Sequence, residues 1–320
     1  MNLRPVFIAG CDRSGTTMLG NILGAAPEAA ATPESQFIHE LLLLMHIRAF
    51  SSPLDAAKWL QNQFRYAVWD MQCNTEELAT LIELAYPRQT VINLVNAYFN
   101  RFYDDESRPK VWVDHTPDNF KHSAVLAHYF PEAYFIHIVR DGRAVYHSVK
   151  NLDWGPNNAY AATRFWAERL QQALSAEISA ESRCVRVRYE DILQRPEQRI
   201  AELCNAVGLP YQNCMLTGNS LDLPRFTRHQ HLLVGNRPDL SRANIWQEKL
   251  SQREIGEFEA YPWSRTLLEA MGYELYTKKP MKISFITMLL RYVHNYISYF
   301  INRLKHRRTE KLTLQRYKGL

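Results

Sequence analysis

The chain alternates short apolar segments with longer segments of helical periodicity. Short runs rich in Val, Ile and aromatic residues predict buried parallel strands at 6–9, 110–113, 133–139 and 184–188. Apolar residues at helical spacing predict helices at 16–25, 36–50, 53–66, 75–85, 90–103, 118–130, 142–150, 158–180 and 196–207. Strands followed by helices, repeated along the chain, favour an α/β fold, a three-layer αβα parallel sheet.

Three parts of the chain depart from this alternation. Residues 37–103 have helical periodicity but little strand character, which predicts a helical cap insertion within a main domain spanning 1–275. Residues 211–242 are rich in Asn, Pro, Gly, Asp and His and predict a long loop. Residues 276–320 form a basic tail, in which apolar residues between 286 and 304 predict an amphipathic helix.

Charge is concentrated in this tail. Lys278 to Leu320 holds 11 of the 38 Lys and Arg residues and one of the 33 acids, so the remainder has 27 basic and 32 acidic residues. The net charge of +5 therefore says little about the main domain, and nucleic-acid binding is not expected. Five cysteines without a C-x-x-C pair predict neither a disulfide framework nor a zinc site. Together with the lack of an apolar leader, they indicate a cytoplasmic location.

The segment between the first predicted strand and the first helix has the spacing of a phosphate-binding loop. It reads Gly-Cys-Asp-Arg-Ser-Gly-Thr-Thr over residues 10–17. Backbone N–H groups at a helix N-terminus suit a tetrahedral anion. The candidate binding residues are Arg13, Ser14, Gly15, Thr16 and Thr17. Because Thr16 stands where a Walker A loop has its lysine, hydrolysis of ATP or GTP is disfavoured, although the fold is expected to be P-loop-like.

A second candidate anion site follows the strand predicted at 133–139. Arg140 ends that strand, and Ser148 lies about two turns into the next helix. An arginine at this edge of a parallel sheet can bind a phosphate, or it can form a salt bridge that ties strand to helix. Two anion sites imply a nucleotide with two separated phosphate groups.

The Arg-Ser-Gly-Thr-Thr loop at 13–17 and Val-Arg-Asp-Gly-Arg at 139–143, with Ser148, resemble the sulfotransferases that use 3′-phosphoadenosine 5′-phosphosulfate (PAPS). The resemblance spans roughly residues 5–275 and is greatest to the bacterial and tyrosylprotein branch. It includes His-Thr-Pro at 115–117 and Val-Arg-Tyr-Glu-Asp at 187–191. It implies PAPS as donor and 3′-phosphoadenosine 5′-phosphate (PAP) as product, and the transfer requires no metal.

The resemblance also assigns roles to the candidate residues. The loop from Arg13 to Thr17 would bind the 5′-phosphosulfate, Arg140 and Ser148 the 3′-phosphate, and Tyr189 would lie against the nucleotide. Glu34 takes the place of the catalytic glutamate of the tyrosylprotein enzymes and would be the general base. Without the resemblance, Glu34 would be interpreted as a charge on the surface or as the N-terminal residue of a helix.

The catalytic candidates are completed by Arg13 and His115. Sulfuryl transfer needs donors for charge on the leaving oxygens, which Arg13 would supply. His115 stands where related enzymes often have a lysine. A protonated His115 could replace that lysine and a neutral one could act as a base, or the residue could simply cap the following helix.

The expected function is transfer of a sulfuryl group from PAPS to a hydroxyl of a carbohydrate or glycoconjugate. Aromatic residues near the second anion site could line an acceptor pocket, or could pack in the core: Trp154, Tyr160, Phe165 and Trp166. The alternatives are a protein-tyrosine sulfotransferase and a non-catalytic nucleotide-binding protein.

The basic tail predicts a contact with a membrane surface or with protein. An apolar helix face beside cationic residues suits peripheral contact of residues 283–311 with an anionic membrane, on its inner face. The alternatives are a helix packed on the body of the protein or on a second subunit in a homodimer.

Overall fold

The structure is a computed structural model that describes residues 3–180, 183–218, 221 and 234–317. Its described part contains one five-stranded sheet in the order β2-β3-β1-β4-β5, in which every pairing is parallel. The strands are β1 (Arg4–Ala9), β2 (Ala29–Ala31), β3 (Val111–Asp114), β4 (Tyr134–Val139) and β5 (Cys184–Arg188). The predicted α/β fold with a parallel sheet is confirmed.

The short strand β2 is the strand of the described sheet that the sequence pattern missed, and the helices at 189–194, 245–249, 252–259 and 262–270 were not predicted either. β2 consists of three alanines, a residue type that is depleted in strands, so its sequence carries no strand signal. Ala29 pairs with Val111 and Ala31 with Val113, which places β2 at the edge of the sheet beside β3.

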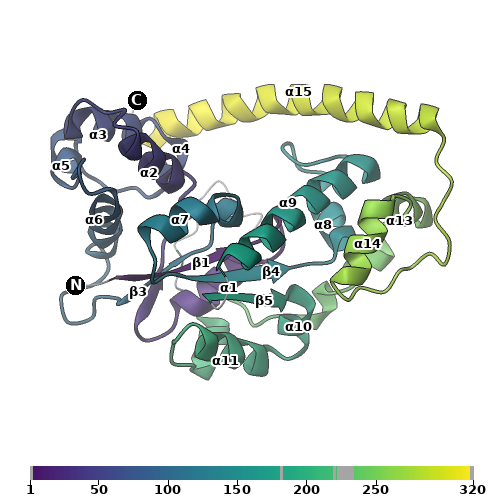
Figure 1. Cartoon of the computed structure of the whole chain (residues 1–320), viewed down its shortest axis with the longest axis horizontal. Helices are drawn as coiled ribbons and strands as arrows, with labels where there is room; N and C mark the ends of the chain where they lie inside the picture. Colours follow the sequence, from purple (N-terminus) through teal and green to yellow (C-terminus); the bar gives the residue numbers. More distant parts are fainter. Residues whose placement is uncertain (1–2, 181–182, 219–220, 222–233, 318–320) are drawn as a thin grey trace.

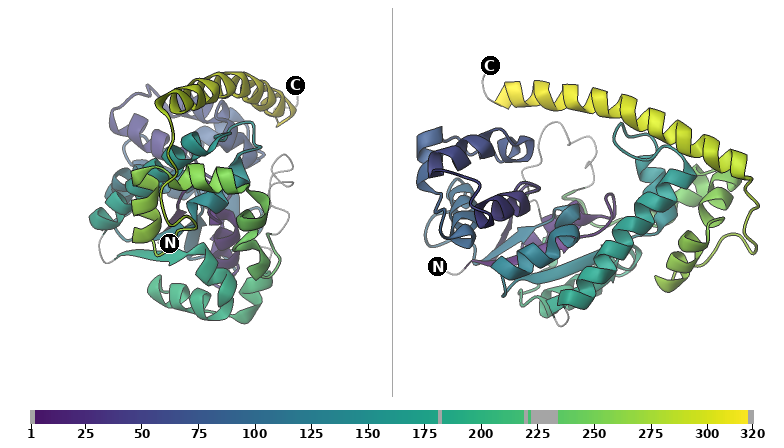
Figure 2. Two further views of the ribbon diagram at one scale, coloured as in Figure 1. Left: turned by 90° about the vertical axis from the view of Figure 1, so that its right-hand side faces the viewer. Right: turned by 45° about the horizontal axis from the view of Figure 1, so that its top comes forward.

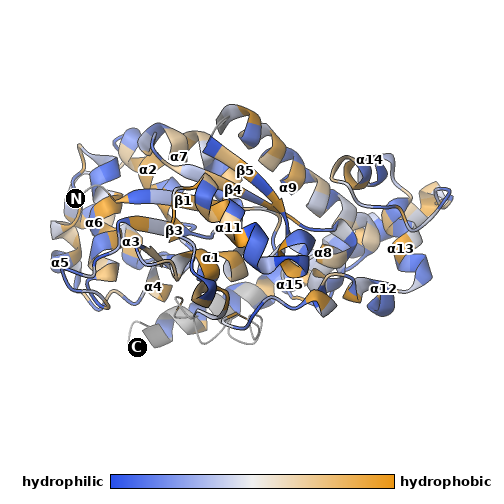
Figure 3. Ribbon diagram, turned by 90° about the horizontal axis from the view of Figure 1, so that it is seen from below, coloured by the Kyte–Doolittle hydropathy of each residue, from blue (hydrophilic) through white to orange (hydrophobic). Residues whose placement is uncertain are grey.

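Helices cover both faces of the sheet (Figure 1). Side chains of β1 alternate: Val6 and Ile8 pack on one face and Phe7 and Ala9 on the other. The first face is covered by α1 (Thr16–Gly24), α10 (Tyr189–Gln194) and α11 (Pro196–Ala206). The second is covered by η1 (Pro117–His122), α7 (Ser123–Tyr129) and α9 (Ala159–Ala180). The strands carry many of the apolar residues, as Figure 3 shows.

The stretch between β2 and β3 is helical and extends the second layer beyond the sheet (Figure 2). Its helices are α2 (Ile38–His46), α3 (Pro53–Gln61), α4 (Phe64–Val68), α5 (Thr75–Thr80) and α6 (Pro87–Phe99). The helix predicted at 36–50 is shorter, because the chain takes a left-handed conformation at Arg48, with φ of 55°. The helix predicted at 53–66 is divided into α3 and α4.

A third cluster of buried residues joins the helix after β4 to the C-terminal part of the chain. It involves α8 (Gly142–Val149), α12 (Ile245–Lys249), α13 (Gln252–Glu259) and α14 (Pro262–Ala270). The loop predicted at 211–242 contains η3 (Asn213–Thr217) and η5 (Leu240–Arg242), and its positions 219–220 and 222–233 lie outside the described residues. The tail forms α15 (Phe285–Tyr317), which lies along one outer edge of the molecule in Figure 1.

Candidate active site

The loop between β1 and α1 has the backbone geometry of an anion cradle. Arg13 and Gly15 are both left-handed, with φ of 66° and 98°. A Cβ atom on Gly15 would lie 2.6 Å from the Tyr189 ring, so only glycine fits this close approach. Alternation of left- and right-handed residues at a helix N-terminus turns backbone N–H groups into one concavity, which suits a phosphate or sulfate.

Hydroxyl groups line the same turn. Ser14 is completely buried, and its Oγ has no hydrogen-bond partner within the described part of the chain. Thr16 and Thr17, the first residues of α1, are also buried. A buried hydroxyl without a partner costs about 1–3 kcal/mol. The loop is therefore suited to an anionic ligand that would accept from Ser14.

Four residues assigned to the nucleotide from the sequence meet beside this loop. Arg13 Nε donates to Ser148 Oγ at 3.2 Å, and Arg140 Nη1 donates to the Arg13 carbonyl oxygen at 2.7 Å. The Arg140 guanidinium lies 4.4 Å from the centre of the Tyr189 ring. Burial, and next the nearby charge of Arg140, lower the pKa of Arg13. Two adjacent cations of this kind favour binding of a multiply charged anion.

Arg140 does not act as a tie between strand and helix. Among the described residues it forms no ion pair, and its buried Nε has no hydrogen-bond partner. Its ring contact with Tyr189 and its bond to the loop backbone leave donors for a ligand. The salt-bridge alternative for Arg140 is therefore not what the structure shows.

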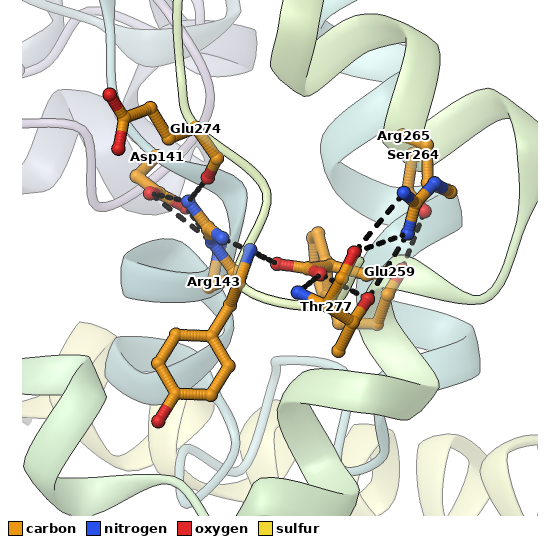
Figure 4. Close-up of polar contacts among 9 residues, drawn as sticks. Asp141, Arg143, Glu259, Ser264, Arg265, Glu274 and Thr277 are labelled. Carbon is orange, nitrogen blue, oxygen red and sulfur yellow. Dashed lines mark hydrogen bonds and ion pairs between the residues drawn. The ribbon is translucent and has the colours of Figure 1, made fainter. Parts of the chain in front are cut away.

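The second arginine of the same motif has a structural role instead (Figure 4). Arg143 is almost fully buried, and its Nη2 and Nη1 atoms lie 2.6 Å from Asp141 and 2.5 Å from Glu259. Glu259 accepts from the Thr277 backbone N–H at 2.7 Å, and Arg143 donates to the Glu274 carbonyl oxygen at 3.0 Å. This network attaches α8 to α13 and to the segment that leads into the tail.

Glu34 reaches the site because β2 and β3 are adjacent parallel strands. Their carboxyl ends meet at one edge, and the loops that follow are joined by hydrogen bonds. The Ser35 backbone N–H donates to Thr116 Oγ1 at 2.8 Å, and the Ser35 hydroxyl donates to the buried Asp114 carboxylate. These bonds hold the segment of Glu34 against the segment of His115.

Glu34 has a charged partner that the sequence did not reveal. Arg65 of α4 lies 3.1 Å from a carboxylate oxygen of Glu34, and it also donates to Gln36 at 3.0 Å. The Glu34 side chain is 18% exposed. Arg65 belongs to no motif, and only the folding of the helical stretch over the sheet edge brings it here.

His115 is buried and unpartnered. Neither ring nitrogen has a hydrogen-bond partner in the described structure, and the ring packs against α1, where a Cβ on Gly20 would lie 2.8 Å from the Cγ atom of the ring. Burial lowers the pKa of His115, although Glu34 and Asp114 act in the opposite direction. Because neither ring nitrogen bonds to the backbone of the following helix, His115 does not cap η1.

The four aromatic residues considered as an acceptor lining have different neighbours. Trp166 is almost completely buried, and its indole N–H donates to the Arg140 carbonyl oxygen at 3.1 Å. Phe165 stacks under Arg169 at 3.8 Å, and Tyr160 packs on Tyr261 at 5.3 Å between ring centres. Trp154 is half-buried. Core packing is the role of Trp166.

Within the described ranges, no group of His, Cys, Asp and Glu residues is arranged to bind a metal ion. In that same part of the chain, no helix combines the length and the apolar character needed to cross a bilayer.

Comparisons with known proteins identify the family of this chain. A model of the sulfotransferase family matches residues 5–213. Protein-tyrosine sulfotransferase 1 of Danio rerio is 23% identical over 217 residues, covering 66% of this chain and 55% of that protein. The chain thus spans about half the length of that relative. Omega-hydroxy-beta-dihydromenaquinone-9 sulfotransferase Stf3 of Mycobacterium bovis is 23% identical, with 87% of this chain and 78% of that protein covered.

Solved structures show the same fold. The sulfotransferase domain of the Synechococcus PCC 7002 olefin synthase superposes with a TM-score of 0.60 at 20% identity, covering 86% of this chain and 96% of that one. The sulfotransferase domain of the curacin biosynthetic pathway gives a TM-score of 0.58 at 19% identity, with 86% and 100% covered. With more than half of its residues matched by the family model, this chain belongs to the sulfotransferase family.

Proposed function

We propose that this protein transfers a sulfuryl group from PAPS to a hydroxyl of a carbohydrate or glycoconjugate, with Glu34 as general base. One observation carries the proposal: the unpartnered hydroxyl of Ser14 and the adjacent Arg13 and Arg140 lie at the same sheet edge as Glu34 and His115. Anion-binding and proton-accepting groups thus converge where ligands of parallel sheets bind.

The donor would occupy the loop and the helix after β4. Backbone N–H groups of the loop, with Ser14 and Arg13, would hold the 5′-phosphosulfate, while Arg140 and Ser148 would hold the 3′-phosphate. The Tyr189 ring, which already contacts the Arg140 guanidinium, would pack against the nucleotide. No residue of the loop supplies the lysine that ATP would need.

The transfer itself requires one proton acceptor and charge stabilisation. The Glu34 carboxylate takes the proton of the acceptor hydroxyl while that oxygen forms a bond to sulfur. The bond from sulfur to the phosphate oxygen breaks, and its electron pair leaves with PAP. Arg13 and the loop N–H groups stabilise the charge that develops on the leaving oxygens. His115 would lie near the reacting oxygens, where a protonated ring would stabilise the leaving oxygen and a neutral ring would assist as a base.

Arg65 would act as a positioning residue for this base. Its guanidinium fixes one carboxylate oxygen of Glu34 at 3.1 Å, and the other oxygen is left for the acceptor. Because Arg65 comes from the helical stretch and not from the sheet, acceptor binding and orientation of the base would depend on the same region.

A tyrosine acceptor is the second candidate. It is favoured by the similarity to protein-tyrosine sulfotransferase 1 of Danio rerio, although the chain covers 55% of that protein. The name of the Mycobacterium bovis relative specifies a hydroxylated menaquinone, so hydroxyl acceptors of different size occur among the similar proteins. A labelled-PAPS screen over glycans, tyrosine peptides and lipid alcohols, read by mass spectrometry, would separate these classes.

Donor binding can be tested independently of the acceptor. PAP should raise the melting temperature without Mg²⁺, because binding to the folded state alone stabilises it. Stabilisation by Mg-ATP only would contradict the proposal. Binding of PAP with no transfer to any acceptor in the screen would support a non-catalytic nucleotide-binding protein.

The proposed place of action is the cytoplasm. All five cysteines are free thiols, and Cys11 and Cys204 are buried. Free thiols are typical of a reducing compartment.

A further inference from the structure

The tail helix α15 is packed on the protein through its polar side. Arg291 lies 3.1 Å from Glu257 of α13, a residue that is 5% exposed, and the Arg291 carbonyl oxygen accepts from Asn158 at 3.2 Å. The half-buried positions of the helix recur at helical spacing: Thr287, Met288, Arg291, Asn295, Ser298 and Asn302. These residues form the inner face of α15. An amphipathic helix of a globular protein normally buries its apolar face instead.

The apolar face of α15 therefore points away from the body. Phe285 is 71% exposed, Leu290 64% and Tyr296 66%. The exposed large side chains of this outer face are Phe285, Ile286, Leu289, Leu290, Tyr292, Val293, Tyr296, Ile297, Tyr299, Phe300, Ile301 and Leu304. An apolar surface of this extent is unusual on a protein that meets only water, and it marks an interaction site.

The same outer face becomes basic in its last turns. Arg303, Arg307 and Lys311 are exposed and follow one another at intervals of four residues, so they continue the line of the apolar residues along the helix. Three further exposed lysines precede the helix, at Lys278, Lys279 and Lys282. The outer face is thus an apolar and aromatic strip with cations at both ends.

We propose that the outer face of α15 docks on an anionic lipid bilayer, with the helix parallel to the surface. The apolar side chains would enter the boundary between headgroups and acyl chains, and the cations would contact lipid phosphates. Tyr292, Tyr296 and Tyr299 suit the interface, since each ring can be buried while its hydroxyl stays hydrated. At 33 residues, α15 is about 50 Å long and offers an extended contact.

A second copy of the chain fits this face less well. In a parallel pair of α15 helices, Arg303, Arg307 and Lys311 would lie beside the same residues of the partner helix, and like charges repel. In an antiparallel pair, these cations would be buried against apolar side chains. An anionic lipid surface instead can contact the apolar residues and the cations of the outer face at the same time.

Docking would also fix how the rest of the protein meets the surface. Besides α9 and α13, α15 contacts α4, the helix that carries Arg65. Figure 2 shows α15 extending from the side of α9 to the helical stretch. A bilayer bound to α15 would therefore lie along both the body and the region that orients Glu34.

Vesicle flotation tests the docking directly. The full chain should float with phosphatidylglycerol-containing vesicles at low salt, and it should bind far less to phosphatidylcholine vesicles or at high salt. A variant with Arg303, Arg307 and Lys311 changed to Gln should partition roughly 10²-fold less, since each cation near an anionic surface contributes about fivefold. A matched control changes three exposed cations elsewhere: Lys58, Lys121 and Arg195 to Gln. The control should float like the wild type.

A second variant separates apolar insertion from charge attraction. Changing Ile286, Leu289 and Val293 to Ser should weaken binding even at low salt, while the same change at the exposed Leu43, Ile47 and Ile178 should not. Circular dichroism and melting temperature verify that each variant is folded. The proposal is wrong if the full chain stays unbound, or if the basic variant and its control bind equally.

The oligomeric state of the protein tests whether a second copy of the chain binds the outer face. Analytical ultracentrifugation without lipid should show no association that depends on the outer face. A dimer that the Ser variant converts to a monomer would identify a second copy as the occupant and would overturn the proposal. None of these measurements depends on sulfuryl transfer, so the docking and the proposed enzymatic function can fail separately.

Discussion

Arg13 Nε donates a hydrogen bond to Ser148 Oγ at 3.2 Å across 135 positions of sequence. The bond joins the loop after β1 to the helix after β4, two strands that are neighbours in the parallel sheet. The residues of the two anion sites inferred from the sequence therefore lie side by side. A single nucleotide with phosphate groups at both ends could bridge them.

Removal of either site arginine should weaken PAP binding. Each of Arg13→Ala and Arg140→Ala removes a charge-assisted contact worth about 1.5–3 kcal/mol, or roughly 10- to 10²-fold in affinity. Isothermal titration calorimetry measures the loss. Arg164→Ala is a matched control, because Arg164 pairs with Glu168 on the surface of α9 and lies outside the site. Unchanged affinity in a folded Arg140→Ala variant would contradict its assignment.

Disruption of the Arg143 network should affect stability rather than donor binding. Glu259→Leu leaves a buried arginine with one carboxylate partner fewer, and loss of one member of a buried pair costs about 3–5 kcal/mol. Urea unfolding should show this decrease in the free energy of unfolding. The fraction that remains folded should bind PAP with near wild-type affinity, whereas a loss comparable to that of Arg140→Ala would place Glu259 at the donor site.

Glu34→Gln should separate binding from chemistry. The amide cannot accept the acceptor proton, so turnover should fall by roughly 10² to 10⁴ while PAP affinity stays nearly constant. Single-turnover assays with labelled PAPS, alongside calorimetry, measure the two effects. Arg65→Gln should also lower turnover with PAP binding preserved, and Arg65→Lys should restore part of it, because Lys can supply a charge but not the same geometry.

The turnover of Glu34 and His115 variants can show which of the two residues is the general base. With Glu34 as base, His115→Ala should lower turnover less than Glu34→Gln does. If Glu34→Gln keeps near-normal turnover and His115→Ala abolishes it with PAP binding intact, the neutral imidazole of His115 is the base.

A stacked pair of histidines should make the protein sensitive to acid. The rings of His39 and His122 are 3.4 Å apart, and burial, followed by the charge of His122, lowers the pKa of His39 to about 4. In the unfolded chain a histidine titrates near pH 6.5, so from there down to about pH 4 the unfolded state binds the extra proton and is favoured.

The free energy of unfolding should therefore decrease as the pH falls through this window, and His39 should contribute nothing above it. His39→Gln should flatten the decrease when urea unfolding is followed at a series of pH values. His294→Gln, at an exposed position on α15, is the control and should leave the slope unchanged. Equal slopes for wild type and His39→Gln would exclude the stacked pair as the source.

The sequence was sufficient for the turn between β1 and α1, for three of the four longer strands to within one residue, and for the end of β1, because these segments leave local patterns. Val6 to Ala9 is an apolar run, and the loop has its own glycine and hydroxyl spacing. β2 leaves no such pattern. Its three alanines form a strand only because the backbone of β3 is available beside them, which is a tertiary effect.

The roles within the Val-Arg-Asp-Gly-Arg segment also required the fold. The resemblance assigned Arg140 to the phosphate and gave Arg143 no role. Only the structure shows that α8 turns Arg143 toward the carboxylate of Glu259, whereas Arg140 points to the loop. The pairing of Arg65 with Glu34 is of the same kind, because it depends on how the helices after β2 fold over the sheet edge.

The pairing of β2 with β3 determines how an insertion or deletion in the chain would affect the positions of Glu34 and His115. Glu34 and His115 follow adjacent parallel strands, while the whole of α2 to α6 is looped out between them. An altered loop between α5 and α6 would leave the backbone of Glu34 and of His115 in place. A single residue inserted between Ala31 and Glu34 would shift the carboxylate relative to Ser35 and its bond to Asp114. A change in α4 would move Arg65, the charged partner of Glu34, whereas the hydrogen bonds that hold the Glu34 segment against the segment after β3 lie outside the looped-out helices. These helices can therefore vary in length without displacing the backbone of Glu34.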